Sequence, residues 1–468
     1  MEITETDRQS IDQYVNGTVY TGTQDPEDRA GAQLLAPHHP AVVLEAESAE
    51  DVSRAVAFAA DHGMQVAVQA TGHGRTRALH RGLLIDTGCM CEVRVDSGTR
   101  RAWVPAGATW QHVIEQAAPH GLAPLSGSLP TVGALSYTLG GGVGLLARRY
   151  GYSADHVTRF EAVTADGKIR QVSPEDEPDL FWALRGGGGN VAVVTGMEIG
   201  LMPVAELYGG SLMFDLAKSP EVLTAWTAWT RSVPEAMTSA VAVIPFPDLP
   251  MIPADVRGRQ VVQLQVSFAG PEEEGRRLVE PLLHAGSPLR NTLRTIPYIE
   301  SGAVFDEPDR PAAYRGKSVL VDGLDPRSLS ELSHRAGGCI VGVRHLGGAL
   351  ARTPNVPSAV GHRSAQYSVG VLSLLHNSDP SGVSQVQDEL LAPFAPRRLG
   401  LSLNFTFGPV EPDQVRSAFT PADADRLGEI TARYDPCGVL YANHPIPTPS
   451  ESTSAADHSS ALLSRPTS

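Results

Sequence analysis

Cysteine is scarce in this sequence, with four residues in a chain of 468. So few thiols cannot form the disulfide framework of a small secreted domain. Cys89 and Cys91 form a C-x-C motif near His80 that could contribute to a zinc site, but no second motif with matching spacing accompanies it. We therefore expect the cysteines to be small buried packing residues.

Long apolar runs and an excess of positive charge are also missing. No stretch of eighteen apolar residues occurs, so we expect no membrane span. Asp and Glu number 52 against 37 Lys and Arg, and the net charge of −15 argues against nucleic acid or anionic membranes as partners. The first ten residues, MEITETDRQS, are polar and acidic, unlike a secretion signal, which favours a cytoplasmic location.

The most regular pattern lies ahead of the first glycine-rich turn. Residues 42–44 form an apolar strand, and Ser48 is a good N-cap for a helix with Asp51 three positions later. Gly63 would end this helix, and a second strand begins at Val66. Strand, helix and strand of these lengths predict an α/β unit. The buried helix face is expected to contain Val52, Val56, Ala57 and Ala60.

The rest of the chain predicts an α+β fold in two large parts. Short strands are expected within 82–107, 159–173 and 191–195, with a helix over 109–118. Beyond residue 205 apolar strands alternate with helices and proline-rich connections, which favours a mainly antiparallel sheet flanked by helices. A final helix precedes an extended segment, and the last residues are rich in Ser and Thr. The expected divisions are 1–204, 205–400, a return segment 401–449 and a disordered tail 450–468.

Three glycine clusters stand out, at residues 72–74, 140–144 and 186–189. Glycine turns let backbone N–H groups approach phosphate oxygens, so three of them predict a large cofactor that contains a diphosphate. Gly142, Gly144 and Ala147 fit the nicotinamide-dinucleotide pattern G-x-G-x-x-A, but no clean strand precedes them. A P-loop is excluded, because none of these turns contains G-K-[ST].

The order of motifs resembles the FAD-linked oxidases with a vanillyl-alcohol-oxidase (PCMH) type FAD domain, in the berberine-bridge-enzyme-like and 6-hydroxy-D-nicotine-oxidase-like branch. The resemblance covers residues 38–449. It is carried by GHG after a strand, RAWVPAGATWQHV, GSLPTVGALSYTLGGGVGLLARRYGYSADHV, PDLFWALRGGGGNVAVVT, VRHLGGAL and YDPCGVLYANHPIP. It implies a two-part FAD-binding domain, a separate substrate domain and an FAD-dependent oxidoreductase that uses oxygen.

The resemblance also assigns residues to the cofactor. His73 would bond covalently to the flavin 8α-methyl group, and Asn443 would lie near the isoalloxazine edge. The remaining contacts would come from Gln69, Ala70, Thr71, Gly72, Gly74, Val132, Gly133, Gly141, Gly142, Gly144, Asn190, Val191 and Val194.

Three positions depart from the family pattern. Leu129 stands where many relatives have a cysteine that makes a second flavin bond, so a single tether is expected. Gln69 replaces a frequent arginine. Ser402 and Asn404 stand where many members have Y-x-N with a catalytic tyrosine, and a serine hydroxyl cannot act as a phenolate does.

These departures leave the substrate and the catalytic base open. A neutral amine or an acidic phenol or enol needs less help from a base than an alcohol does, which favours an amine or a secondary metabolite as substrate. His345, Tyr367 and His444 are further candidates for a base. A non-redox cyclisation on a flavoprotein and a drug-binding resistance protein remain alternatives. The expected partners are a small-molecule substrate and dioxygen, with a homodimer possible and no metal.

Overall fold

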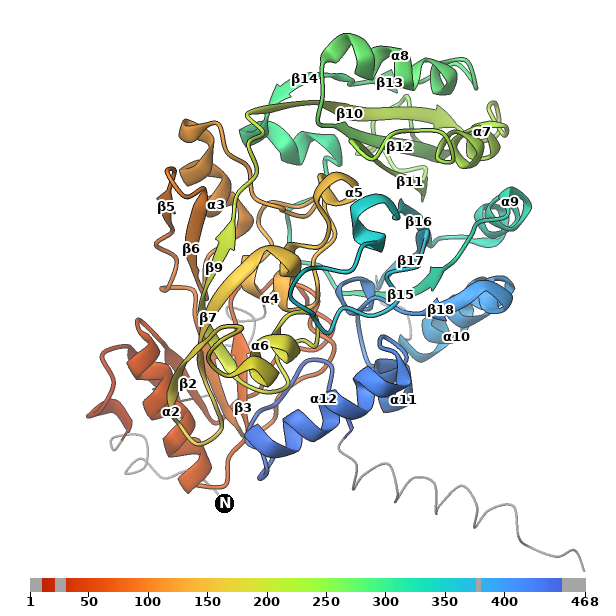
Figure 1. The fold of residues 1–468 in the computed structure, drawn as a ribbon. Coiled ribbons are helices and arrows are strands. Elements are labelled where there is room, and N and C mark those ends of the chain that lie inside the picture. The colour runs from red at the N-terminus through yellow and green to blue at the C-terminus, as the bar shows by residue number, and fades with distance from the viewer. Residues whose placement is uncertain (1–10, 22–30, 376–379, 448–468) are drawn as a thin grey trace, which may run out of the picture.

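The computed structural model describes residues 11–21, 31–375 and 380–447. Within these residues the strands form three sheets, and helices cover their outer faces (Figure 1). No helix in the described part of the chain is both long and apolar enough to cross a membrane. The tail expected over 450–468 lies outside the described residues.

The first sheet contains the predicted α/β unit. Its strand order is β1 (Thr18–Thr21), β2 (Val42–Glu45), β4 (Leu83–Asp86) and β3 (Val66–Gln69), and β4 pairs parallel to both β2 and β3. Helix α2 (Ala49–Asp61) connects β2 to β3, and the Ser48 side chain accepts a hydrogen bond from the backbone N–H of Asp51. The expected strand–helix–strand arrangement and N-cap are therefore confirmed.

The predicted buried face of α2 needs a correction. Val52 and Val56 are fully buried, but Ala60 is exposed and Ala57 is only half-buried. Ala55 and Ala59 take their places, because positions 52, 55, 56 and 59 follow the spacing of one helical face and residues 57 and 60 do not.

A five-stranded antiparallel sheet follows. Its order is β5 (Arg94–Asp96), β6 (Arg101–Pro105), β9 (Val193–Gly200), β7 (Val157–Val163) and β8 (Ile169–Val172). Strand β9 begins two residues later than expected and runs five residues further, because the glycine-rich turn extends through residue 192. The helices of this part are α3 (Trp110–Ala117), α4 (Ala134–Leu139), α5 (Ala147–Tyr150) and α6 (Pro178–Leu184), with the 3-10 turns η1 (Ala118–His120) and η2 (Ser153–His156).

The third sheet is antiparallel and has nine strands, as the sequence pattern beyond residue 205 predicts. Its order is β13 (Arg290–Asn291), β10 (Glu206–Asp215), β12 (Gln260–Phe268), β11 (Met237–Pro245), β16 (Ile340–His345), β17 (Tyr367–Leu374), β15 (Tyr314–Val321) and β18 (Arg398–Gly400), with β14 (Arg294–Pro297) also paired to β10.

Helices cover one face of this sheet and leave the other free. Alternate residues such as Val241, Val343 and Val369 enter a hydrophobic core. The helices that complete this core are α7 (Val222–Trp229), α8 (Glu272–Leu283), α9 (Pro326–Arg335) and α10 (Pro380–Leu391), together with the 3-10 turn η5 (Ala392–Arg397). The 3-10 turn η3 (Tyr298–Val304) packs in the core of the first two sheets, and η4 (Gly348–Ala351) packs in a smaller cluster with α5. The opposite face points toward the first two sheets.

The chain then returns to the first part of the fold. It passes through η6 (Leu403–Phe405), α11 (Pro412–Arg416) and α12 (Pro421–Tyr434), and α12 packs in the same core as the first two sheets. Residues 439–441 add hydrogen bonds to the edge strand β3 through Val66. Residues from both ends of the sequence thus complete one structural unit.

The expectation of buried cysteines is wrong for three of the four. Cys89, Cys91 and Cys437 are exposed, and only Cys339 is buried. Both residues of the C-x-C motif lie in the turn after β4, where the chain follows the surface. Among the described residues, no group of three or more His, Cys, Asp or Glu side chains is arranged to hold a metal ion.

Candidate active site

A cavity of about 1290 Å³ separates the first two sheets from the free face of the nine-stranded sheet. This volume exceeds the range of roughly 300–1,000 Å³ that is typical of a site for one small ligand. One end of the cavity is lined by loops around residues 70–74, 127–143, 188–194 and 440–444. The other end is lined by strands β11, β12, β15, β16 and β17. The cavity therefore has room for a large cofactor and a substrate together.

The loop after β3 carries the predicted tether. His73 lines the cavity, and its Nδ1 forms a hydrogen bond of 2.9 Å with the hydroxyl of Thr71. Burial lowers the pKa of His73 and the carboxylate of Asp309 opposes this effect, so the imidazole is neutral near pH 7. A neutral imidazole has a free nitrogen lone pair, as nucleophilic attachment requires.

The backbone of the same loop is shaped to bind an anion. Gly72 and Gly74 have φ angles of 71° and 67°, which other residues rarely adopt. Among the described residues, none accepts a hydrogen bond from the backbone N–H of Thr71, Gly72 or His73. Consecutive free N–H groups in such a turn form a concave site for phosphate oxygens.

Side chains from distant segments fix this loop in place. The Asn443 amide donates to the Gly74 carbonyl at 3.0 Å and accepts from the backbone N–H of Thr76 at 2.7 Å. The hydroxyl of Tyr314 accepts from the N–H of Gly74 at 3.1 Å. Asn443, expected beside the isoalloxazine edge, lines the cavity and also fastens the loop.

Gln69 lies under the loop and does not line the cavity. Its side-chain oxygen accepts a hydrogen bond of 2.5 Å from the guanidinium of Arg75. Burial lowers the pKa of Arg75 to about 10, so this group keeps its charge at neutral pH. Many family members have an arginine at the position of Gln69. In this chain the guanidinium at that place comes from Arg75, six residues later, and Gln69 binds it.

The second glycine cluster supports the cavity wall from behind. Val132 lines the cavity, whereas Gly133, Gly141, Gly142 and Gly144 do not contribute to this wall. A Cβ atom on Gly144 would lie 1.8 Å from the Ser126 carbonyl, and one on Gly142 would lie 2.5 Å from the Tyr137 ring. The expected direct contact of these glycines is therefore replaced by a packing role, and Gly127 and Gly140 face the cavity instead.

Residues of the third glycine cluster and the segment after it also divide into some that line the cavity and some that are buried in the core. Asn190 and Val194 line the cavity, together with Gly188, Gly189 and Ala192. Val191 was expected at the adenine end, but it is 1% exposed and belongs to the hydrophobic core. Asn190 accepts from the backbone N–H of Ile446 at 3.0 Å and so connects this turn to the return segment.

Two of the five predicted catalytic residues line the cavity. Asn404 donates to the Tyr137 carbonyl at 2.8 Å. His444 contacts the Thr406 carbonyl through Nε2 at 3.3 Å. Because a carbonyl can only accept, the proton lies on Nε2 and Nδ1 keeps its lone pair. Burial lowers the pKa of His444 to about 4, so it is a neutral and weak base.

His345 and Tyr367 do not reach the large cavity. The Nε2 atom of His345 accepts from the guanidinium of Arg148 at 2.7 Å, and burial together with this charge lowers its pKa to about 3. Its ring stacks on Tyr367, whose hydroxyl pairs with Thr230 at 2.7 Å in the core beneath α7. Residue 345 follows a cavity-facing residue on β16, so strand alternation turns it away. Both assignments as a base are corrected.

Ser402 also lies outside the cavity lining. Its backbone N–H donates to the Ser318 hydroxyl at 3.2 Å, and its carbonyl accepts from Thr406 at 2.8 Å. It begins the short turn η6, which brings Leu403, Asn404 and Phe405 into the wall. The position of the family tyrosine therefore serves here to shape the backbone.

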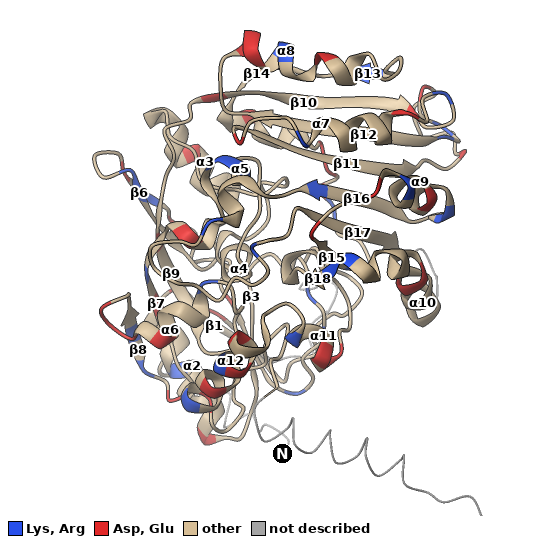
Figure 2. Ribbon diagram, turned by 45° about the vertical axis from the view of Figure 1, so that its right-hand side comes forward, with Lys and Arg blue, Asp and Glu red and all other residues tan. Residues whose placement is uncertain are grey.

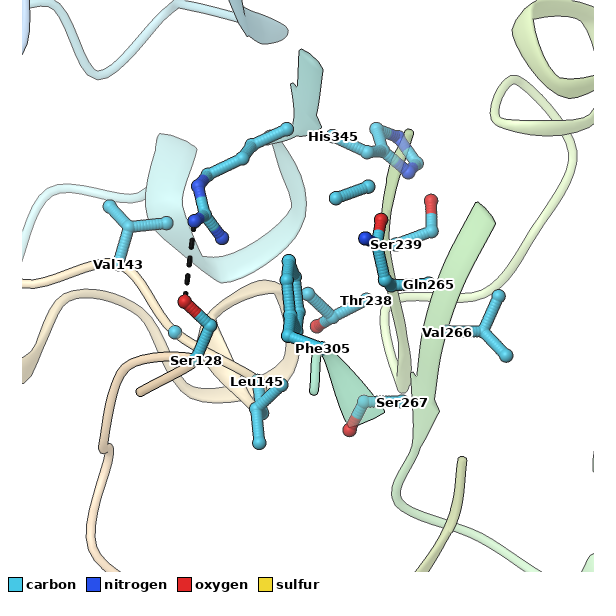
Figure 3. Close-up of a pocket in the computed structure, with 13 residues that line it drawn as sticks. Ser128, Val143, Leu145, Thr238, Ser239, Gln265, Val266, Ser267, Phe305 and His345 are labelled. Carbon is cyan, nitrogen blue, oxygen red and sulfur yellow. Dashed lines mark hydrogen bonds between the residues drawn. The ribbon is translucent and has the colours of Figure 1, made fainter. Parts of the chain in front are cut away.

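A second cavity of about 20 Å³ lies at the end of β16 and is bordered by both Arg344 and His345 (Figure 3). Ser128, Ala240, Gln265 and Phe305 border both cavities. The dashed line in Figure 3 is the hydrogen bond of 3.4 Å that Arg344 donates to Ser128. The space is large enough for about one water molecule.

Sequence reasoning missed Tyr137 and Arg344, although both lie within quoted motifs. The hydroxyl of Tyr137 is buried and has no hydrogen-bond partner among the described residues. Burial raises its pKa far above the usual range, against the effect of Arg344, so the phenol stays protonated. Strand alternation around His345 could have indicated that Arg344 faces the opposite side.

The cavity fits FAD. The free N–H groups of Thr71, Gly72 and His73 suit a pyrophosphate, although of these three residues only His73 lines the wall. The Tyr137 side chain lines the wall as well, and its hydroxyl is buried without a partner among the described residues. Residues 40–173 match the sequence profile of the FAD binding domain. The chain is an FAD-dependent oxidoreductase with a PCMH-type domain. The resemblance inferred from the sequence motifs is confirmed.

Individual relatives agree with this assignment. An uncharacterised FAD-linked oxidoreductase of Bacillus subtilis is 28% identical over 356 residues, which are 72% of this chain and 76% of the relative. The (R)-6-hydroxynicotine oxidase of Paenarthrobacter nicotinovorans is 34% identical over 164 residues, or 35% of this chain and 36% of the relative. The solved structure of a chitooligosaccharide oxidase superposes with a TM-score of 0.81 at 19% identity, covering 95% of this chain and 100% of that one.

Proposed function

We propose that this protein is an oxidase that removes two electrons from a small amine or secondary metabolite and passes them to dioxygen. The observation that carries the proposal is His73, a neutral imidazole at the cavity wall beside three free backbone N–H groups. In this proposal His73 is the only covalent anchor of FAD, since Leu129 occupies the position of a second tether. When bound, FAD supplies the acceptor for a hydride from a substrate C–H bond and returns the two electrons to dioxygen as hydrogen peroxide.

The residues of the chain position the reactants and handle one proton. Thr71 orients the His73 ring, and Asn443 with Tyr314 fixes the loop that binds the pyrophosphate. His444 lines the cavity and can accept a proton through Nδ1, and the carboxylates of Asp306 and Glu307 line the same cavity. The His444 pKa of about 4 suits a substrate that needs little help from a base.

The nature of the substrate follows from these groups. A neutral amine can lose a hydride without prior removal of an O–H proton, whereas an alcohol needs a base. Ser402 supplies no tyrosinate at the position where many family members have a catalytic tyrosine. The name of the relative (R)-6-hydroxynicotine oxidase also supports an amine or a related heterocycle, while a sugar oxidase shares the fold alone.

The covalent link is tested by acid precipitation of the purified protein. Flavin absorbance and fluorescence should stay with the pellet of the wild-type protein and pass entirely into the supernatant for His73→Ala. His80→Ala is the matched control, since His80 is exposed outside the cavity and should leave the link intact. Release of all flavin from the wild-type protein would show that His73 is not a tether.

The use of oxygen is tested with anaerobically reduced enzyme. Mixing with dioxygen should reoxidise the flavin rapidly and yield one hydrogen peroxide per flavin. Slow reoxidation would instead indicate a dehydrogenase with another acceptor. Turnover without oxygen uptake would indicate a non-redox cyclisation, and stoichiometric ligand binding without product would indicate a resistance protein.

A further inference from the structure

The substrate end of the cavity has a floor of unusually small residues. Ala242, Gly342 and Gly370 stand opposite one another on β11, β16 and β17, so they form one continuous row across three strands. All three line the cavity. Large side chains are confined to the edge of this row, where Ile244, Ile340 and Leu372 follow along the same strands. The floor is therefore flat at its centre and apolar at one end.

The backbone does not require glycine at this place. Neither Gly342 nor Gly370 has a positive φ angle. A Cβ atom on Gly342 would meet nothing within 4 Å, and one on Gly370 would make only ordinary contacts of 3.6 Å and longer. Since glycine weakens a strand by roughly 0.5–1 kcal/mol relative to alanine, its presence at two adjacent positions keeps space open above the sheet. A flat ring fits that space.

The other end of the floor carries one positive charge. Arg344 follows Gly342 by two positions on β16, so its side chain shares the same face, between Ala240 and Ser368 on the neighbouring strands. The strands β11, β12, β16 and β17 contain no other Lys, Arg, Asp or Glu (Figure 2). On β15, the Lys317 amine is paired with Asp388 at 2.6 Å beside α10. Arg344 is thus the cation that these four strands present to a ligand on the floor, while Asp306, Glu307 and Arg310 line the cavity from the segment after η3.

The guanidinium of Arg344 is held in place but is largely uncommitted. Its carbon lies 5.0 Å from the ring centre of Phe305 and 4.5 Å from that of Phe405. Within the described part of the chain its hydrogen bond is the long one to Ser128, and the carboxylate of Glu307 is 3.9 Å away, beyond hydrogen-bond distance. Rings over a guanidinium leave its N–H edge free, and this edge binds oxyanions in a bidentate manner.

We propose that the substrate is a flat conjugated compound with an acidic oxygen, and that Arg344 binds this oxygen while the ring lies on Gly342 and Gly370. This inference rests on the proposed function, because it concerns the substrate of the same cavity. The acidic oxygen is a carboxylate or an ionised phenol or enol. An ionised phenol or enol needs no base to deprotonate it, which agrees with the absence of a tyrosine at Ser402.

Ligand binding tests the proposal without knowledge of the natural substrate. Isothermal titration of the flavin-loaded protein with 2-naphthoate and 2-naphthamide compares an anion with a neutral molecule of the same shape. We expect 2-naphthoate to bind about 10- to 100-fold more tightly, as a charge-assisted bidentate pair should. Arg344→Gln should abolish this preference, and Arg344→Lys should keep part of it. Arg335→Gln is the control, since Arg335 is exposed at the end of α9, outside the cavity lining, and should not matter.

Two further variants examine the neighbours of Arg344. Glu307→Gln should tighten 2-naphthoate binding, because it removes a competing carboxylate. Gly342→Val should weaken both naphthyl compounds at least tenfold without lowering the melting temperature, because the added methyl groups fill the space of the ring.

Binding of 4-nitrophenol distinguishes an ionised phenol from a carboxylate as the acidic oxygen. If the site favours phenolates, the bound compound should show the spectrum of its anion at a pH where the free compound is neutral, and Arg344→Gln should remove this shift. A preference for 2-naphthoate without this shift would assign a carboxylate.

Equal binding of 2-naphthoate and 2-naphthamide, or a preference that survives Arg344→Gln in a folded protein, would overturn the proposal. The flavin content and its retention in acid are measured on the same samples. Retained flavin with no preference for the anion would refute only the substrate class, whereas flavin released from the wild-type protein would refute the tether.

Discussion

The two ends of the cavity are formed by different structural elements, loops at one end and a sheet at the other. At the cofactor end the wall consists of loops, and its polar groups are backbone N–H groups beside Gly72 that are fixed by Asn443 and Tyr314 from far along the chain. At the substrate end the wall is a sheet, and its character comes from side chains, with small residues at the centre and Arg344 at one side. A site made of backbone N–H groups suits the cofactor, which is the same in every turnover. A site made of side chains suits a substrate, because single substitutions can alter it without disturbing the fold.

Acidification should produce the largest effect, through two buried histidines, of which His444 lines the cavity and His345 does not. Burial holds the pKa of His444 near 4 and that of His345 near 3, well below about 6.5 in the unfolded chain. Both rings are neutral when folded and gain a proton on unfolding below pH 6.5. Stability is therefore full above pH 6.5 and falls as the pH decreases toward 4, by up to about 1.4 kcal/mol per pH unit for each ring.

Urea denaturation between pH 7 and 4.5 measures this dependence. His444→Gln and His345→Gln should each flatten the slope, which separates their contributions from that of His38, whose pKa is also lowered to about 3. Only His444→Gln should reduce kcat, because only His444 lines the cavity. A fall in kcat with His345→Gln at unchanged stability would contradict the placement of His345 outside the large cavity.

Two glycines sharpen the same comparison. Gly144→Ala should destabilise the fold by about 1–3 kcal/mol, because the new Cβ atom would overlap the Ser126 carbonyl and force the backbone to move. Gly342→Ala should leave stability unchanged or slightly raised, since its Cβ atom would meet nothing. Chemical denaturation of both variants is the measurement. Similar losses in both would mean that the floor, like the loops, depends on its glycines for folding.

Tyr367→Phe should have a smaller effect, confined to stability. The variant loses the hydrogen bond to Thr230 in the core, which costs about 1 kcal/mol. Steady-state kcat at saturating substrate should stay within experimental error, because the hydroxyl lies on the covered side of the sheet. Trp226→Phe, which alters the ring packed against Tyr367, is a suitable control for core disturbance. A large loss of kcat in Tyr367→Phe would show that Tyr367 acts as a catalytic base after all.

Ser402→Ala should have the smallest effect. The side chain does not line the cavity, and its backbone hydrogen bonds to Ser318 and Thr406 do not need the hydroxyl. We expect kcat to change less than about twofold and the melting temperature to stay the same. A pH profile that shifts in Ser402→Ala would be the contrary result.

The parts of the site that could be predicted are those in which the backbone dictates the residue. The turn around His73 and the clusters near Gly142 and Gly188 require glycine for a positive φ or for close packing, so they appear as motifs. The helix from Ala49 and its cap at Ser48 were predicted for a similar reason, since caps have a restricted chemistry.

The other parts depend on which way a side chain points. His345 and Arg344 are neighbours in one motif, yet His345 packs against Arg148 and Tyr367 away from the large cavity, whereas Arg344 lines it. Tyr367 and Ser402 likewise sit in the expected segments but face away from the cavity. Cys89 and Cys91 were expected inside, and the turn that carries them lies on the surface. The sequence shows which chemical groups the chain carries. The direction in which each side chain points depends on the register of the sheet, which the sequence does not show.

The hydrogen bonds that Asn443 makes with Thr76 span 367 residues and set an order of events during synthesis. At roughly 5–20 residues per second, the return segment leaves the ribosome about 20 to 70 seconds after the loop that it fastens. Until then β3 lacks its pairing with residues 439–441, and the loop that carries His73 lacks its clamp. The proposed attachment of flavin to His73 should consequently follow translation, so a nascent chain stalled before residue 435 should carry no covalent flavin.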